Sequence, residues 1–202
     1  MKYDIILRYK NKNKFMLLKT ASSKKEQIAE FQKLFHVKKN NRPVLNIDLQ
    51  YFNYDFANEL EDFLKALKHL NIDIIVNPFF HKDLKKHLPN LNVYEDNLKE
   101  QALKYSDFSL FLSDDKHILN SVKSAFLNAS VPVFYNFKNY SDILIDYNPV
   151  KETGNCFMFK NFNKWEIFEA LIRAIENHKF SWDWQNIVRE GYNAYDELER
   201  KG

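Results

Sequence analysis

Short apolar segments of strand type alternate with segments of helix type from Pro43 to Phe159, and this alternation constrains the fold more than any other feature. The apolar strand-type segments cover residues 43–49, 72–76, 91–94, 108–112, 131–135, 143–145 and 156–159. Helical spacing of apolar residues marks segments 25–35, 56–70, 81–87, 97–105, 120–128 and a helix from Asn163. Alternation at such close intervals predicts βαβ units. We therefore expect an α/β fold with a Rossmann-like, doubly wound, mostly parallel sheet and helices on both faces.

The two ends of the chain extend this core without adding a second domain. Residues 1–23 contain two short apolar runs separated by a polar stretch that is typical of a turn, so they are interpreted as a β-hairpin extension. Residues 180–199 predict a C-terminal helix. Because no linker rich in Pro, Gly or Ser separates any part of the sequence, we expect residues 1–202 to form a single domain.

Composition excludes several classes of function. The chain is 45% hydrophobic, which suffices for a core, and its 30 basic and 27 acidic residues give a net charge of +3. A dedicated nucleic-acid-binding protein carries a larger basic excess, so no nucleic-acid partner is expected. The single cysteine, Cys156, cannot form an internal disulfide and is interpreted as a core thiol in a reducing compartment. No Cys or His residues have metal-ligand spacing, so no metal is expected.

The N-terminal residues favour a cytoplasmic location. Asp4 stands where a signal peptide would carry basic residues, and the apolar run Ile5-Ile6-Leu7 is too short for the core of such a peptide. No apolar run in the sequence approaches the roughly 20 residues that a membrane-spanning helix needs. We therefore expect a cytoplasmic protein with no membrane partner.

Three motifs in the second half of the chain point to a known family. Asp142-Ile-Leu-Ile-Asp-Tyr-Asn-Pro149 follows the strand that begins Val131-Pro132, and Gly154-Asn-Cys-Phe-Met-Phe159 comes next. Phe180-Ser-Trp182 then precedes the last helix. In order and spacing these motifs resemble the C-terminal domain of bacterial glycogen synthases and plant starch synthases, glycosyltransferases of the GT-B fold. The resemblance extends, more weakly, from Lys24 to Tyr195.

This resemblance implies a site for ADP-glucose, whose diphosphate leaving group must be stabilised as the glycosidic bond forms. The family supplies an Arg and a Lys from the loop after the first strand, and an acidic residue and a Gly-Leu pair at the start of a later helix. Cations and backbone N–H groups at a helix N-terminus are the groups that stabilise such an anion. Glycine allows backbone to approach a phosphate closely.

Aligned without gaps, this sequence lacks those groups. The family's Arg falls on Asp48 and its Lys on Asn53, while its acidic residue falls on Lys116 and its Gly-Leu pair on Leu119 and Asn120. If the alignment is shifted by one residue, Asp115 takes the place of the acidic residue. These five aligned positions are our candidate for a vestigial donor cleft: Asp48, Asn53, Lys116, Leu119 and Asn120. Removing a single oxyanion-type donor typically costs about 3 kcal/mol of transition-state stabilisation, so catalysis is expected to be lost.

Aromatic residues gather near the carboxyl ends of the predicted strands, which in an open α/β sheet form the ligand-binding edge. They are Tyr51, Phe52, Tyr54, Phe79, Phe80, Tyr135 and Phe137. Either they fill the former cleft or they form an apolar docking surface. A second aromatic group, Phe180, Trp182, Trp184 and Tyr192, is expected to pack structurally rather than to form a sugar platform.

Two functions remain open from the sequence. The first is a stand-alone glycogen-synthase-like domain without transferase activity or cofactor, which acts by binding a protein or a glycan. The alternative is one half of a split glucosyltransferase that moves glucose from ADP-glucose to an α-glucan, with the N-terminal half as its partner. Whether the chain is an enzyme is thus open; if active, it would be a hexosyltransferase of the glycogen or starch synthase type.

Overall fold

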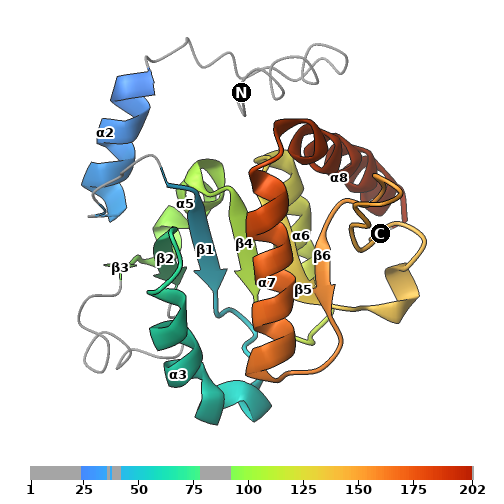
Figure 1. Cartoon of the computed structure of the whole chain (residues 1–202), viewed down its shortest axis with the longest axis horizontal. Helices are drawn as coiled ribbons and strands as arrows, with labels where there is room; N and C mark the ends of the chain where they lie inside the picture. The colour runs from blue at the N-terminus through green and yellow to red at the C-terminus, as the bar shows by residue number, and fades with distance from the viewer. Residues whose placement is uncertain (1–23, 36, 38–41, 78–91, 202) are drawn as a thin grey trace.

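A computed structural model describes residues 24–35, 37, 42–77 and 92–201, and all structural statements concern these residues. Their six strands form one sheet in the order β3-β2-β1-β4-β5-β6, and every neighbouring pair is parallel (Figure 1). The strands are β1 (Val44–Asp48), β2 (Asp73–Asn77), β3 (Asn92–Val93), β4 (Phe108–Phe111), β5 (Val131–Tyr135) and β6 (Phe157–Phe159). The Rossmann-like, parallel α/β sheet that the alternating pattern predicts is confirmed.

Helices cover both faces of this sheet. The α-helices are α2 (Lys24–Phe35), α3 (Ala57–Leu67), α5 (Lys99–Tyr105), α6 (Ile118–Leu127), α7 (Lys164–His178) and α8 (Ser181–Lys201). In Figure 1, α3 and α7 lie in front of the sheet, while α5 and α6 lie behind it. Residues of β1 and β2 are buried along their whole length, as expected for strands covered on both sides.

The helical periodicity of the sequence identifies the core correctly where it is strongest. In α3, Leu60, Phe63, Leu64 and Leu67 are buried against Leu45, Ile47 and neighbouring apolar residues of the sheet. Asn163 begins α7 as its N-cap, because its side-chain oxygen accepts from the backbone N–H groups of Trp165 and Glu166. Cys156 is buried in the core, and burial raises the pKa of its thiol well above its usual value.

Some predicted elements differ from the structure, and others lie outside the described residues. The strand expected at residues 143–145 is not formed. Ile143 and Leu144 are buried, which explains the apolar character of the segment. The segment lies beside the start of β6, because Asp146 and Cys156 form an isolated bridge. The hairpin expected in residues 1–23 and the helix expected at 81–87 fall outside the described residues. The C-terminal helix α8 begins at Ser181 and continues to Lys201.

Two kinds of feature are absent from the part of the chain that the structure describes. Among these residues no helix is both long and apolar enough to cross a bilayer. Nor do the described residues bring three or more His, Cys, Asp or Glu side chains into a group that could bind a metal ion.

Candidate functional site at the carboxyl edge of the sheet

The strand order places a topological switch point between β1 and β4. From β1 the chain proceeds outward to β2 and β3, and then returns to the other side of β1 as β4. In open α/β sheets, ligands bind outside the carboxyl ends of the strands at such a point. The loops after β1 and β4 meet there, because the Asn53 N–H donates to the Leu112 carbonyl at 2.8 Å. The predicted cleft residues Asp48 and Asn53 therefore lie across the switch point from the β4–α6 loop.

Asp48 ends β1 and its side chain has no exposed surface. Its carboxylate lies 2.8 Å from the ammonium of Lys99, the first residue of α5, and also accepts from the Gln50 N–H at 2.9 Å. Lys99 additionally donates to the side-chain oxygens of Gln50 and, at 3.1 Å, of Ser121. The negative charge that replaces the family's Arg is thus neutralised inside the fold, a pairing that the sequence pattern does not reveal.

Asn53 stabilises the backbone of the same loop by capping a short helix. Its side-chain oxygen accepts from the Asp55 N–H at 2.8 Å and so caps the short 3-10 helix η1 (Tyr54–Phe56). The next residue, Tyr54, is 65% exposed, whereas Phe52 is buried and meets the Tyr54 ring edge-on at 5.8 Å. The position that aligns with a phosphate-binding Lys therefore carries a neutral amide that holds backbone in place.

The remaining candidate residues lie at the N-terminus of α6. Lys116 and Asn120 are exposed, and Leu119 is buried. Asp115 reaches over this end of the helix: its carboxylate accepts from the His117 N–H at 2.9 Å and contacts the His117 ring nitrogen at 2.6 Å. The backbone hydrogen bond from His117 holds the pKa of the Asp115 carboxyl below its usual range. A side-chain carboxylate therefore lies in the turn that leads into α6, beside the end of the helix that would attract an anion.

A contact across the switch point joins the two loops. The ring of Tyr51 lies 5.8 Å from the ring of His117, centroid to centroid. Tyr51 adopts a left-handed backbone conformation with φ 58°, which is uncommon for a residue with a large side chain. The structure thus brings the β1 loop and the start of α6 together through Tyr51 and His117, two residues absent from the predicted cleft. No spacing in the sequence signals that contact.

Exposed aromatic rings mark the same edge of the sheet. Tyr51, Tyr54 and Trp165 are 41%, 65% and 74% exposed, respectively. Trp165 belongs to the first turn of α7, and the neighbouring Lys164 N–H donates to Glu59 of α3 at 3.2 Å. Of the aromatic residues predicted at this edge, Tyr51 and Tyr54 are exposed and Phe52 contributes to the core. Phe79 and Phe80 lie outside the described residues, and Trp165 was not predicted.

The second aromatic group divides between core and surface. Trp184 and Tyr192 are buried, and Trp184 packs edge-on against Phe108 and His178 at 5.2 and 4.8 Å. Phe180 and Trp182 are exposed. Structural packing is therefore confirmed for the two buried rings.

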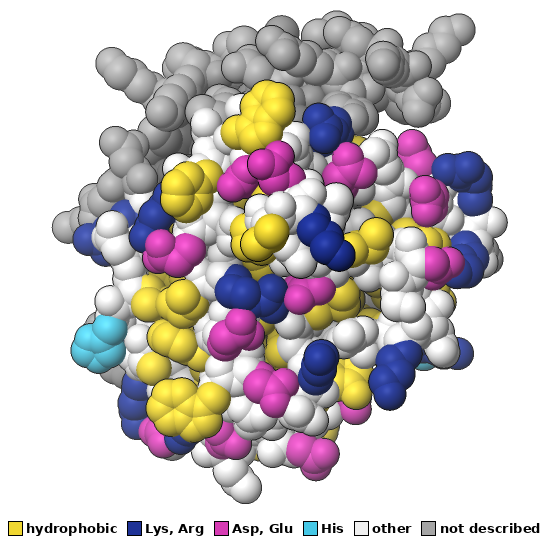
Figure 2. Space-filling model, turned by 45° about the vertical axis from the view of Figure 1, so that its right-hand side comes forward, with side chains coloured by type: hydrophobic (Ala, Val, Ile, Leu, Met, Phe, Trp, Pro, Cys, Tyr) yellow, Lys and Arg dark blue, Asp and Glu magenta, His cyan; other side chains and the backbone are white. Residues whose placement is uncertain are grey.

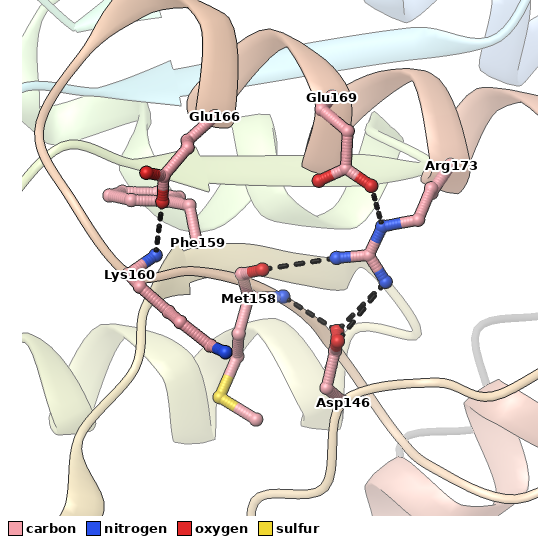
Figure 3. Close-up of a pocket in the computed structure, with 7 residues that line it drawn as sticks. All are labelled: Asp146, Met158, Phe159, Lys160, Glu166, Glu169 and Arg173. Atoms are coloured by element: carbon pink, nitrogen blue, oxygen red, sulfur yellow. Dashed lines mark hydrogen bonds and ion pairs between the residues drawn. The ribbon is translucent and has the colours of Figure 1, made fainter.

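A separate cavity of about 430 Å³ lies at the open edge of β6 (Figure 3). It is lined by Asp146, Met158, Phe159, Lys160, Glu166, Glu169 and Arg173. None of these residues belongs to the predicted cleft, although Asp146 is part of the motif that carries the family resemblance. Arg173 forms ion pairs with Asp146 and Glu169, and both Arg173 and Asp146 bind the backbone of Met158 in β6.

Together, the parallel sheet and its switch-point loops define a Rossmann-like domain of the GT-B C-terminal type. The catalytic domain of starch synthase IV from Arabidopsis thaliana, solved with ADP and acarbose, matches 87% of this chain and 41% of its own, with a TM-score of 0.64 and 14% identity. WaaG, a glycosyltransferase of lipopolysaccharide biosynthesis, matches 87% of this chain and 48% of its own, with a TM-score of 0.55 and 14% identity. The C-terminal CMP-Kdo-binding domain of WaaA from Acinetobacter baumannii matches 84% and 96%, with a TM-score of 0.53 and 12% identity. At these identities the likeness establishes the fold.

Within this class the chain resembles glycogen and starch synthases. Glycogen synthase 1 of Synechocystis is 27% identical over 64 residues, which are 32% of this chain and 13% of that protein. A RING finger protein of Plasmodium falciparum is 29% identical over 108 residues, 50% of this chain and 8% of that protein. The single Cys156 cannot supply the zinc ligands of a RING finger. No protein-family model matches the sequence. The chain spans a small part of either curated relative.

Proposed function

We propose that this chain is a GT-B C-terminal-type domain that has lost its donor-diphosphate site and acts by binding, without transferase activity of its own. The observation that carries this proposal is the Asp115 carboxylate bound over the N-terminus of α6. A carboxylate beside a helix N-terminus repels a diphosphate. The first N–H groups of α6, those of Ile118, Leu119 and Asn120, in turn donate to backbone carbonyls of the preceding turn. Across the switch point, the Asp48–Lys99 pair leaves no uncompensated cation in the position of the family's Arg.

The exposed rings of Tyr51, Tyr54 and Trp165 support a partner at the carboxyl edge. Aromatic side chains supply large contact area at small entropic cost, and they are enriched in binding surfaces. We propose that this edge binds either a glycan or a protein. Nucleic acid is not favoured, because Figure 2 shows basic and acidic side chains interspersed over the face in view rather than a basic stripe. A cytoplasmic location is part of the same proposal.

Isothermal titration calorimetry with ADP-glucose, ADP and UDP-glucose tests the loss of the donor site. We expect no binding at concentrations up to the millimolar range. The starch synthase IV catalytic domain, which was solved with ADP bound, serves as the positive control. A dissociation constant in the low micromolar range for any of the three compounds would contradict the proposal.

The split-enzyme alternative is supported by coverage. This chain matches 41% of the starch synthase IV chain, so the other part of that fold has no counterpart here. A complementary half, on the same or on another polypeptide, would have to bring the acceptor and the missing cations. Co-expression with such a half, followed by an assay for glucan synthesis from ADP-glucose, tests this alternative. Absence of synthesis by a stable complex of the two halves counts against it.

A further inference from the structure

In the sheet that the described residues form, β6 is an edge strand, and side chains bind its outward backbone groups. The Phe159 carbonyl accepts from the Asn136 N–H at 2.9 Å, so Phe159 faces β5. Backbone groups alternate in direction along a strand, and those of Met158 therefore point away from the sheet. An outward-facing N–H and C=O form a template on which a strand of another molecule can pair.

Both outward groups of Met158 have partners within the chain (Figure 3). The Met158 N–H donates to Asp146 at 2.8 Å, and the Met158 carbonyl accepts from the Arg173 guanidinium at 3.0 Å. Arg173 also binds both oxygens of Asp146, at 3.1 and 3.2 Å, and Glu169 at 2.7 Å. These bonds form a closed ring around one residue of the edge.

The bonding continues in both directions along β6. Before Met158, the segment 145–147 lies beside the strand, since the Tyr147 N–H donates to the Cys156 carbonyl at 2.9 Å. After Met158, the Lys160 N–H donates to Glu166 of α7 at 3.1 Å. The guanidinium of Arg173 lies over the Phe157 ring, 5.6 Å from its centroid, which fixes its position. Backbone of segment 145–147 thus covers the edge before Met158, and side chains take the place of a neighbouring strand from Met158 onward.

We propose that Asp146, Glu166 and Arg173 form an edge cap that prevents β6 from pairing with β6 of a second copy of this chain. Two identical edges related by a two-fold axis would pair antiparallel, which the outward groups of Met158 would permit once uncapped. The cap contains three charged side chains held by several bonds each, so an incoming strand would have to break these bonds. This inference does not depend on the proposed binding function.

The test compares Arg173→Leu with Arg189→Leu. Arg189 is an exposed residue of α8 that pairs with Glu190, so it controls for the loss of a surface Arg. We expect Arg173→Leu to raise the mass measured by light scattering from 24.3 kDa toward the dimer as concentration increases, whereas Arg189→Leu stays monomeric. Adding Met158→Pro removes the outward N–H and is expected to restore the monomer.

Amide hydrogen exchange distinguishes an opened edge from general unfolding. In Asp146→Ala, exchange at Met158 is expected to be about tenfold faster at low protein concentration, because a charged acceptor is lost. A folded Arg173→Leu variant that remains monomeric at all concentrations would overturn the proposal. If Arg173→Leu does not fold, Asp146→Ala takes its place, and dimerisation supports the cap while a monomer overturns it.

Discussion

At the scale of single residues, Asp48 shows how a buried charge depends on its partner. Its carboxylate is fully buried at the end of β1, whereas the side chain of Lys99 retains 24% of its exposure. The two residues are therefore unequal: Lys99 can turn to water if Asp48 is neutralised, but Asp48 cannot escape if Lys99 is removed. Removing one partner of a buried ion pair costs far more than replacing both with apolar groups.

Substitutions at this pair should be asymmetric. We expect Lys99→Ala to lower the free energy of unfolding by about 3 kcal/mol, because it leaves an unpaired buried carboxylate. Asp48→Asn should cost about 1 kcal/mol, because one charge-assisted contact is lost while Lys99 gains hydration. Urea denaturation at pH 7 measures both values. If Asp48→Asn proved the more destabilising substitution, the assignment of Lys99 as the neutralising partner would be wrong.

The residue scale is also where the sequence says least about the site. The alignment of the family's Arg with Asp48 predicts the loss of a phosphate-binding cation, and this prediction needs only the identity of one residue. The pairing of Asp48 with Lys99 and the contact of Tyr51 with His117 join separate elements, which no local spacing encodes. If the alignment is shifted by one residue, Asp115 takes the place of the family's acidic residue, but its bond to the His117 N–H is visible only in the structure.

At the scale of elements, α7 begins with a dense set of bonds to Glu166. This carboxylate accepts from the N–H groups of Lys160 and Asn161 and from the side-chain amides of Asn161 and Asn163. Those hydrogen bonds, first the one from the Asn161 side chain, hold the pKa of the Glu166 carboxyl below its usual range. The ionised group thus joins the end of β6 to the start of α7.

The stability that Glu166 contributes should depend on pH. A lowered folded pKa means that this stability is present above the unfolded value, about pH 4.3, and is lost as the pH falls through the folded value. We expect Glu166→Gln to be less stable than the wild type at pH 7, with the difference shrinking at acidic pH. Glu176→Gln, at the other end of α7, is the matched control. Urea denaturation at pH 7 and at acidic pH measures the difference in the free energy of unfolding between Glu166→Gln and the wild type. A difference that does not change with pH contradicts this role.

Helices and strands are predictable from the sequence where burial against the sheet determines their pattern of apolar residues. The apolar face of α3 and the β-branched run of β2 are visible in sequence because both are buried by the same sheet. The segment 143–145 has the same apolar character, because Ile143 and Leu144 are buried. It nevertheless lies beside β6 without forming a strand. Apolar composition predicts that a segment is buried but does not determine whether its backbone pairs.

At the scale of the whole molecule, the two ends of the sheet present different aromatic residues. Tyr54 and Trp165 lie where β1 and β6 have ended, at the carboxyl edge. Trp182 follows α7, which runs back along the sheet, so it lies at the opposite end (Figure 1). All three are more than half exposed, which makes Trp182 a matched control for binding at the carboxyl edge.

Native affinity electrophoresis with glycogen in the gel tests where a glycan binds. We expect retardation of the wild type, a several-fold weaker effect in Trp165→Ala and Tyr54→Ala, and no change in Trp182→Ala. The reason is that the apolar C–H faces of sugar rings pack on exposed aromatic rings, each at modest energy. Equal loss in all three variants would argue against a binding surface at the carboxyl edge. No retardation of the wild type would exclude this glycan and leave a protein as the partner.

Asp115 has one more consequence, which concerns competition. A carboxylate attached to the chain two residues before the N–H that it binds has an effective local concentration on the order of molar or above. A dissolved phosphate ester at millimolar concentration must displace this tethered competitor before it can bind. Under the proposed loss of the donor site, raising the concentration of nucleotide sugar would do little to restore binding, and only a substitution at Asp115 would remove the competing carboxylate.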